Sequence, residues 1–293
     1  MGTIYLNGRF ADDHDASLDP LDRGVLLGDG IFETIRFEEG QLLFHVAHFA
    51  RLGRNARIVE IPWNMAPEEL LAICQQVIDA NRLAMGRLRI TVTRGELGTS
   101  PEVGAASGAP TVIVSVAPVN AESLALQRQR GWTGMVAPFP VNHRSPLAAV
   151  KSTSYQANLM ARHRARREGH DEAILLNTDG LLAEGAMTNL FVVKEGRVLT
   201  PPIEDGALPG ILRLKLGILC ARVGIGWAEE SLALEQLLGA DEAFMTNVVC
   251  EVMPLVRVGD APIGNGQPGS ITTRLQSEHR RDVTQFLATM RRG

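Results

Sequence analysis

The sequence has no apolar run long enough to cross a bilayer, and its first residues lack the pattern of a secretory signal. A membrane-spanning helix needs about 20 predominantly apolar residues, and a signal peptide needs a basic stretch followed by an apolar one. The opening "MGTIYLNGRF" has neither feature. The sequence therefore predicts a cytoplasmic protein that does not contact membranes.

Cysteine is scarce. Cys74, Cys220 and Cys250 are widely spaced, and each lies in an apolar context. This is typical of buried thiols in a reducing compartment rather than of a disulfide framework or a zinc site. We therefore expect no metal.

Positive charge is not concentrated either. The net charge is -4, and the one basic cluster, at 162–167, is typical of a solvated helix face. Nucleic-acid-binding proteins carry a broad basic surface, so we expect no nucleic-acid partner.

What remains is an ordinary globular composition, with 45% hydrophobic and 21% charged residues in a chain of 293. This length allows two domains. Alternating strands and two helices, 45–58 and 67–83, predict a small α+β domain at 1–118. Glycines before the strand "IFETIRF" predict a loop over 24–30, and the polar stretch 119–131 is the expected linker.

The second half, 132–293, predicts a larger domain in which short strands separated by glycine turns alternate with helices. One helix is expected from Ser152 to Glu168, with Ser152 or Thr153 as its N-cap. A long helix is expected at the C-terminus. The predicted fold is α/β (or α+β), with two mixed domains and a cleft between them.

Two charged residues stand in unusual surroundings. Lys151 follows the apolar run 146–150, and Glu184 is flanked by small residues in "AEGAMTN". Taken alone, Lys151 is more typical of a surface lysine, and Glu184 of a turn. However, burial beside apolar sequence favours a neutral amine, and a neutral amine is a nucleophile towards carbonyls. Pyridoxal phosphate chemistry needs such an amine, an acid at the pyridinium nitrogen and an anion site.

The motifs "KSTSYQANLMA", "LLAEGAMTNLFVV", "LTPP", "GALPGILR" and "ADEAFMTN" occur in this order along the chain. Together they resemble the class IV, or fold-type IV, pyridoxal-phosphate enzymes. That family contains branched-chain and D-amino-acid aminotransferases, (R)-selective amine transaminases and aminodeoxychorismate lyases. The resemblance runs from about residue 3 to beyond 270. It implies a domain that carries the Schiff-base lysine at 132–293, with the cofactor in the cleft.

The resemblance implies roles for individual residues. Lys151 matches the Schiff-base lysine, which also moves the proton during transamination. Glu184 matches the acid at the pyridine nitrogen, and Asn189 an asparagine next to it. Tyr155 matches a position that hydrogen-bonds the phenolic oxygen, although its spacing from the lysine is one residue shorter than in branched-chain enzymes. A turn asparagine is an equally good interpretation of Asn189.

A phosphate site is implied by three further segments. Arg51, in "HFARLGRN", matches the phosphate arginine, and guanidinium binds phosphate bidentately. Its neighbours Arg54 and Arg57 are expected to be exposed. The amides of Ile211 and Leu212 follow "LPG" at a helix start, where anions bind. The third segment is "FMTN", in which Thr246 and Asn247 could add backbone and side-chain donors.

The substrate is less well defined. Arg89 matches an arginine in the substrate region, although a salt bridge would explain it equally well. Arg87 stands where branched-chain enzymes usually carry tyrosine, and Thr34 where they carry glycine. The stretch "TRGELGTSP" lacks the "R-x-H" pattern of the best-known D-amino-acid enzymes.

The resulting hypothesis is a transaminase that moves an amino group between an amino acid and a 2-oxo acid, with branched-chain and D-amino acids as the candidate classes of amino acid. The alternative is 4-amino-4-deoxychorismate lyase, which releases pyruvate, because Thr34, "TRG" and "MTNVVCEVMP" resemble that group. A non-enzymatic scaffold is a third interpretation, but a decayed site is expected to have lost Lys151, Glu184 or Arg51. The resemblance also implies a homodimer, with loops 24–30 and 95–109 suited to reach the partner.

Overall fold

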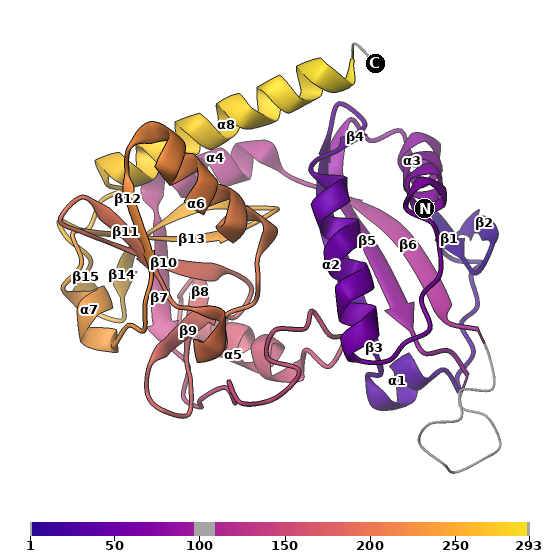
Figure 1. The fold of residues 1–293 in the computed structure, drawn as a ribbon, viewed down its shortest axis with the longest axis horizontal. Helices are drawn as coiled ribbons and strands as arrows, with labels where there is room; N and C mark the ends of the chain where they lie inside the picture. Colours follow the sequence, from indigo (N-terminus) through magenta and orange to yellow (C-terminus); the bar gives the residue numbers. More distant parts are fainter. Residues whose placement is uncertain (1, 97–108, 292–293) are drawn as a thin grey trace. The chain divides into compact units, whose positions relative to one another are not determined.

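The computed structural model describes residues 2–96 and 109–291, and the chain divides into two compact units. The first comprises Met1–Val119, Val150–Ser154 and Phe286–Gly293; the second comprises Asn120–Ala149 and Tyr155–Gln285. Each unit contains a β-sheet with helices packed against it (Figure 1). Within the described residues, no helix combines the length and the apolar character that crossing a membrane requires.

The sheet of the first unit has the strand order β2-β1-β6-β5-β3-β4, and neighbouring strands are antiparallel. Its strands are β1 (Thr3–Leu6), β2 (Arg9–Asp12), β3 (Gly30–Glu38), β4 (Gln41–Leu42), β5 (Met85–Thr93) and β6 (Thr111–Pro118). Its helices are α1 (Arg23–Leu27), α2 (His45–Ile58) and α3 (Pro67–Asn81). The two expected helices are confirmed. β1 and β2 form a hairpin whose turn residues, Asn7 and Gly8, both have positive φ.

The two faces of this sheet differ because side chains alternate along a strand. On β3, Ile31, Ile35 and Phe37 are fully buried in the core formed with α2 and α3. Phe32 and Thr34 point to the opposite face. The core therefore fixes which side chains of β3 and β5 remain available for chemistry.

The second unit has a mixed sheet with the order β12-β11-β10-β13-β14-β7-β8-β9, and β15 pairs with β14. Its strands are β7 (Trp132–Val136), β8 (Glu172–Leu176), β9 (Leu182–Gly185), β10 (Asn189–Lys194), β11 (Arg197–Thr200), β12 (Gly226–Glu229), β13 (Glu242–Asn247), β14 (Glu251–Val258) and β15 (Ala261–Pro262). The helices after residue 119 are α4 (Ala121–Arg130), α5 (Gln156–Arg167), α6 (Ile211–Val223), α7 (Leu234–Leu238) and α8 (Ser270–Met290), with a 3-10 turn at Ile203–Asp205. The expected mixed α/β fold is confirmed.

Lys151 lies in the first unit, whereas the sequence placed it in the second domain. The reason is strand pairing over a long sequence distance. The amide of Phe32 donates to the carbonyl of Lys151 at 2.9 Å, and that of Thr153 donates to Gly30 at 2.8 Å. Ile31 and Ser152 form an antiparallel bridge. The lysine is thereby attached to the start of β3.

This pairing also moves the start of the following helix. Ser152 and Thr153 were expected to cap it, but α5 begins at Gln156 with Tyr155 as N-cap. The stretch 119–131, expected as a linker, consists largely of α4, whose N-terminus is capped by the Asn120 side chain. The loop expected over 24–30 contains the short helix α1, capped by Asp22. Residues 97–108 of the second loop lie outside the described residues.

Candidate active site

Lys151 is half-buried, and its amine lies against an aromatic ring in the first unit. Nζ is 4.6 Å from the centroid of Phe32, on β3. The guanidinium carbon of Arg89, on β5, lies 3.8 Å from the same centroid. Cations within about 6 Å of an aromatic centroid are attracted to the ring. The structure therefore brings two predicted residues, Lys151 and Arg89, to one phenylalanine that the sequence analysis missed.

Arg89 belongs to a row of side chains across the face of this sheet that lies opposite the core. Thr34 is its partner on β3, and Ser115 its partner on β6. Its Nε donates to Thr91 Oγ1 at 3.0 Å. Arg87, also exposed, lies two residues away on the same face. Thr34 and Arg89, both predicted from the sequence, are thus neighbours on one face.

Arg51 lies on the other side of the sheet, buried between α2 and β3. Its Nε and Nη2 donate to the two carboxylate oxygens of Glu33, both at 2.7 Å. His48 Nδ1 lies 2.8 Å from Glu33 Oε2. The nearby arginines, Arg54 and Arg57, are exposed as expected. Arg51 is therefore held rigidly by a carboxylate that the sequence did not identify.

The charges in this cluster follow from its geometry. Burial by itself would raise the pKa of Glu33, but the charge of Arg51 and the hydrogen bonds from Arg51 and His48 lower it to about 2. Burial lowers the pKa of His48, despite the raising effect of Glu33. The imidazole is consequently neutral and donates its Nδ1 proton to the carboxylate. A glutamate at a core-facing position of an apolar strand is the sequence signal that could have found this cluster.

Glu184, in the second unit, is the third charged residue singled out by the sequence, and it lies on β9. Its Oε2 accepts from Asn189 Nδ2 at 3.2 Å and from the amide of Leu208 at 2.9 Å. Asn189 also donates to the carbonyl of Leu208 at 2.8 Å. Asn189 thus contacts Glu184, and the two donors fix the orientation of the carboxylate.

Donors for an anion gather next to Asn189. It pairs with Thr246 across β10 and β13, and a Cβ added to Gly210, the N-cap of α6, would meet Asn189 Oδ1 at 2.0 Å. The first amides of a helix, here those of Ile211 and Leu212, have no intrahelical acceptor. Thr246 Oγ1 is buried and has no hydrogen-bond partner among the residues described. These groups form a compact set of predicted donors.

Tyr155 and Asn247 meet at the turn between β9 and β10. The hydroxyl of Tyr155 donates to the carbonyl of Ala186 at 3.1 Å, and Asn158 donates to the same oxygen at 3.0 Å. Asn247 Nδ2 donates to the carbonyl of Met187 at 3.1 Å. The turn therefore joins the start of α5 to the end of β13.

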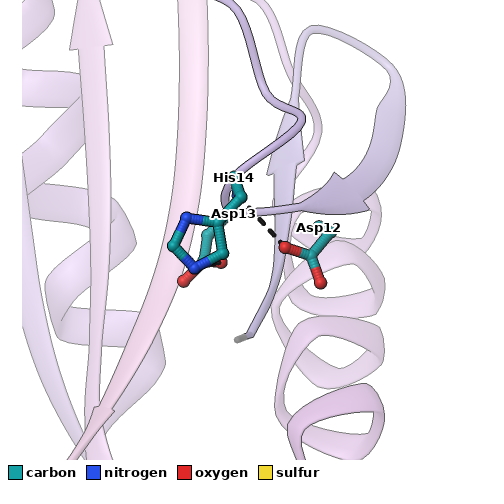
Figure 2. Close-up of side chains that lie close together, drawn as sticks. All are labelled: Asp12, Asp13 and His14. Atoms are coloured by element: carbon teal, nitrogen blue, oxygen red, sulfur yellow. Dashed lines mark hydrogen bonds and ion pairs between the residues drawn. The ribbon is translucent and has the colours of Figure 1, made fainter.

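In the described part of the chain, one group of side chains has the types and spacing of metal ligands. Asp12, Asp13 and His14 lie at the end of β2 and just after it, with ligand atoms within 4.8 Å of one another (Figure 2). The amide of His14 donates to Asp12 Oδ1 at 3.1 Å. Asp13 and His14 are exposed, and acidic groups at a surface are common without a metal, so we assign no role to this group. All three cysteines are buried thiols, as expected.

Known proteins resemble this chain over nearly its whole length. Relatives include the branched-chain-amino-acid aminotransferase of Escherichia coli (32% identity, 93% of this chain and 90% of the relative). The D-alanine aminotransferase of Bacillus licheniformis is 31% identical, with 94% of each chain covered. The aminodeoxychorismate lyase of Bacillus subtilis is also 31% identical, with 97% of this chain and 96% of the relative covered.

Solved structures agree. The branched-chain aminotransferase of Thermoproteus uzoniensis, crystallised with norvaline, has a TM-score of 0.87 at 28% identity, covering 96% of this chain and 94% of that one. The family model "Amino-transferase class IV" matches residues 30–258. The chain therefore belongs to the class IV aminotransferase family, whose members use pyridoxal phosphate.

Proposed function

We propose that the chain transfers an amino group between an amino acid and a 2-oxo acid, with pyridoxal 5'-phosphate as cofactor and Lys151 as the residue that binds it covalently. The observation that carries the proposal is the donor set around Asn189. It combines an oriented carboxylate, Glu184, with the orphan hydroxyl of Thr246 and the first amides of α6. An acid for a pyridinium nitrogen and donors for a phosphate are what this cofactor requires.

The residues present fit the group on chemical grounds. Thr246 Oγ1 is a buried hydroxyl without a hydrogen-bond partner among the described residues, and such an atom costs free energy unless a ligand satisfies it. The helix start at Gly210 adds amides and a favourable dipole for an anion. When bound, the cofactor acts as an electron sink for bonds at the substrate α-carbon.

Three side chains then have distinct tasks. Lys151 supplies the amine that holds the cofactor and afterwards moves the proton at the substrate α-carbon. Glu184, kept in place by Asn189 and Leu208, holds the proton on the pyridine nitrogen. Arg51 binds the phosphate, with its side chain already fixed by Glu33. Fixing the donor before binding removes an entropic cost of association.

The proposed cofactor contacts also include Tyr155, at the phenolic oxygen, and Asn247, beside the phosphate. Both are anchored to the β9–β10 turn, through the carbonyls of Ala186 and Met187. Asn189 acts by orienting Glu184. The two remaining contacts are the backbone amides of Ile211 and Leu212, so the apolar side chains of these residues are no obstacle.

For the substrate, we propose that Arg89 binds a carboxylate and that Thr34 lies beside it. Arg89 and Lys151 contact the same ring, so a carboxylate on Arg89 brings the rest of a small substrate close to the amine. Arg87 extends the positive face by one further guanidinium. This arrangement supports amino acids and 2-oxo acids as substrates. Branched-chain and D-amino acids are the side-chain classes suggested by the relatives.

The lyase is the second candidate. Supporting it are the similarity to the Bacillus subtilis aminodeoxychorismate lyase over 97% of the chain and the residues Thr34 and "MTNVVCEVMP". Release of pyruvate from 4-amino-4-deoxychorismate, measured beside transamination of L-leucine, D-alanine and an (R)-amine, separates the two activities.

We also propose that the protein is a cytoplasmic homodimer. The support is an apolar surface on and beside α1, where Leu21, Val25, Leu26 and Leu27 are about half exposed. Exposed apolar side chains gathered in this way are typical of protein interfaces. Sedimentation of the purified chain measures the oligomeric state.

Borohydride reduction of the yellow holoprotein tests the covalent role of Lys151. We expect the visible band to disappear and the label to appear on the Lys151 peptide. Lys151→Ala should abolish both the label and turnover. Lys194→Ala is the matched control, because Lys194 is half exposed and pairs with Asp241 at the surface. A label on another lysine, or a chain that never takes up pyridoxal phosphate, would contradict the proposal.

A further inference from the structure

In the hairpin formed by β13 and β14, the residue that follows the turn has an unusual backbone conformation. Glu251, the first residue of β14, has a φ of +60°. This left-handed region favours glycine, because a Cβ is crowded there. Glu251 is nevertheless buried, with 7% of its surface exposed. A glutamate at this position requires an explanation from its side chain.

The carboxylate of Glu251 joins the hairpin to helix α4 and to the part of α8 that belongs to the same unit. Arg128, on α4, donates from Nη2 to Glu251 Oε2 at 2.6 Å and to the carbonyl of Cys250 at 3.0 Å. On α8, His279 Nε2 lies 3.6 Å and Arg280 Nη1 4.0 Å from Glu251 Oε1. Both helices and the hairpin strands are labelled in Figure 1. Glu251 is therefore held by a charge-assisted hydrogen bond from Arg128 and, at longer range, by two side chains of α8.

The side chain of Asn247 also fixes this loop, residues 247–250. Its Oδ1 accepts from the amides of Val249 and Cys250, both at 2.8 Å. Its Nδ2 is already engaged with the carbonyl of Met187. Thr246, with its orphan hydroxyl, immediately precedes it. A shift of residues 249–250 would consequently disturb the side chain of Asn247 directly, and Thr246 through the adjoining backbone.

We infer that Glu251 is a positioning residue for the cofactor phosphate: tied to Arg128 and α8, it holds the 247–250 loop so that Thr246 and Asn247 keep their donor geometry. This inference rests on the proposed function. Glycine at position 251 would adopt the positive φ without strain but would lose the contacts with α4 and α8. Alanine would lose the same contacts and keep the strain. The two substitutions therefore separate backbone strain from positioning.

The experiment measures the dissociation constant for pyridoxal phosphate per folded molecule, together with the melting temperature of the apoprotein. Glu251→Gly and Glu251→Ala should both weaken cofactor binding by roughly 10- to 100-fold, the size seen when groups that orient ligand-binding side chains are lost. Glu251→Ala should lower the apoprotein melting temperature more, because it keeps the positive φ. Glu251→Gln, which retains the shape without the charge, should lie between these variants and the wild type.

Arg128→Met should weaken binding as much as Glu251→Gly, and the double variant should be no weaker, because the two groups act as one unit. Arg130→Met is the matched control: it removes another arginine of α4, one whose largely exposed guanidinium pairs with Asp171. Wild-type affinity in both Glu251→Gly and Arg128→Met would overturn the inference while leaving the proposed function intact. A wild-type chain that binds no pyridoxal phosphate would instead overturn the proposed function, and the inference with it.

Discussion

Two glutamates of this protein are equally buried but differ in charge. Glu33, on β3 of the first unit, and Glu172, on β8 of the second, both have 0% of their surface exposed. Glu33 receives two N–H groups from Arg51 and one from His48, and its pKa is lowered to about 2. Burial raises the pKa of Glu172 to about 7, because Arg162, Arg166 and neighbouring amides offset it only in part.

At equal burial, therefore, the partner of each carboxyl decides which of the two is ionised. Glu172 Oε1 accepts from the adjacent amide of Ala173 at 3.0 Å, and its Oε2 has no close hydrogen-bond partner among the described residues. Glu33, by contrast, is held by a bidentate guanidinium. Glu33 is therefore an ionised anchor for an arginine, whereas Glu172 is a carboxylic acid over much of the pH range.

Removing the charge of Glu33, the paired carboxylate, should have the largest effect on the free energy of unfolding. In Glu33→Gln the buried guanidinium of Arg51 loses its counter-charge, and removing one partner of a buried pair costs about 3–5 kcal/mol. Urea unfolding of the apoprotein measures the loss, and weaker pyridoxal phosphate binding should accompany it because Arg51 is no longer fixed. The control is Arg54→Gln, because Arg54 is exposed on α2, the helix that also carries Arg51. Its free energy of unfolding should stay within about 0.5 kcal/mol of the wild type. Equal stability of the two variants would contradict the anchoring role.

Glu172 should have the second-largest effect on the free energy of unfolding, and this effect depends on pH. The pKa of Glu172 is higher in the folded chain than the ordinary value of 4.5, so its contribution to stability is complete below pH 4.5 and is lost as the pH rises through about 7. With about 1.4 kcal/mol per pKa unit, the loss is about 3 kcal/mol. Glu172→Gln, which cannot ionise, should remove this slope. Unfolding free energies between pH 5 and 8 measure it, with exposed Glu122→Gln as the control.

For Glu33, the free energy of unfolding should change with pH in the opposite direction. Its pKa is lowered, so its contribution is present above pH 4.5 and is lost as the pH falls through about 2. The acid limb of the stability curve should therefore change in Glu33→Gln and the neutral limb in Glu172→Gln. A slope that moved in the same pH range in both variants would show that the two sites do not differ as described.

The sequence predicted elements whose patterns are local. The helix at 45–58 has the expected bounds because its apolar spacing is complete within the segment. The motifs around Lys151, Glu184 and Arg51 were also recognisable, because a motif is defined by the types and order of its residues and does not depend on their partners in space. Local pattern and motif were enough to identify the fold and the candidate residues.

The partners of those residues were harder to predict, because they come from distant segments. Arg51 and Glu33 are separated by 18 positions, so the core-facing acid of β3 indicates a buried partner but not which residue it is. The attachment of Lys151 to β3 depends on a bridge between Ile31 and Ser152. The same bridge engages Ser152 and displaces the start of the helix to Gln156.

Arg87 extends the comparison to a charge at the surface, where the smallest effect is expected. It lies opposite Arg36 and two residues from Arg89, and no ion pair joins it to the described residues. Glu38 pairs with Arg36 and leaves the charge of Arg87 without such compensation. Like charges directly opposite each other on a strand pair are destabilising, whereas a bound carboxylate would neutralise them. The protein should consequently prefer a substrate with a second carboxylate.

Arg87→Gln should lower kcat/KM for a dicarboxylic donor such as glutamate by about 5- to 30-fold, corresponding to about 1–2 kcal/mol. For glutamine, which has the same shape without the second charge, kcat/KM should stay within a factor of about two, since a surface charge alone contributes little. Arg89→Gln should lower kcat/KM for both donors, because Arg89 is proposed to bind the carboxylate that they share. Arg57→Gln, exposed on α2, is the control for lost charge. If Arg87→Gln changed both donors equally, the second guanidinium would act on protein charge rather than on a substrate carboxylate.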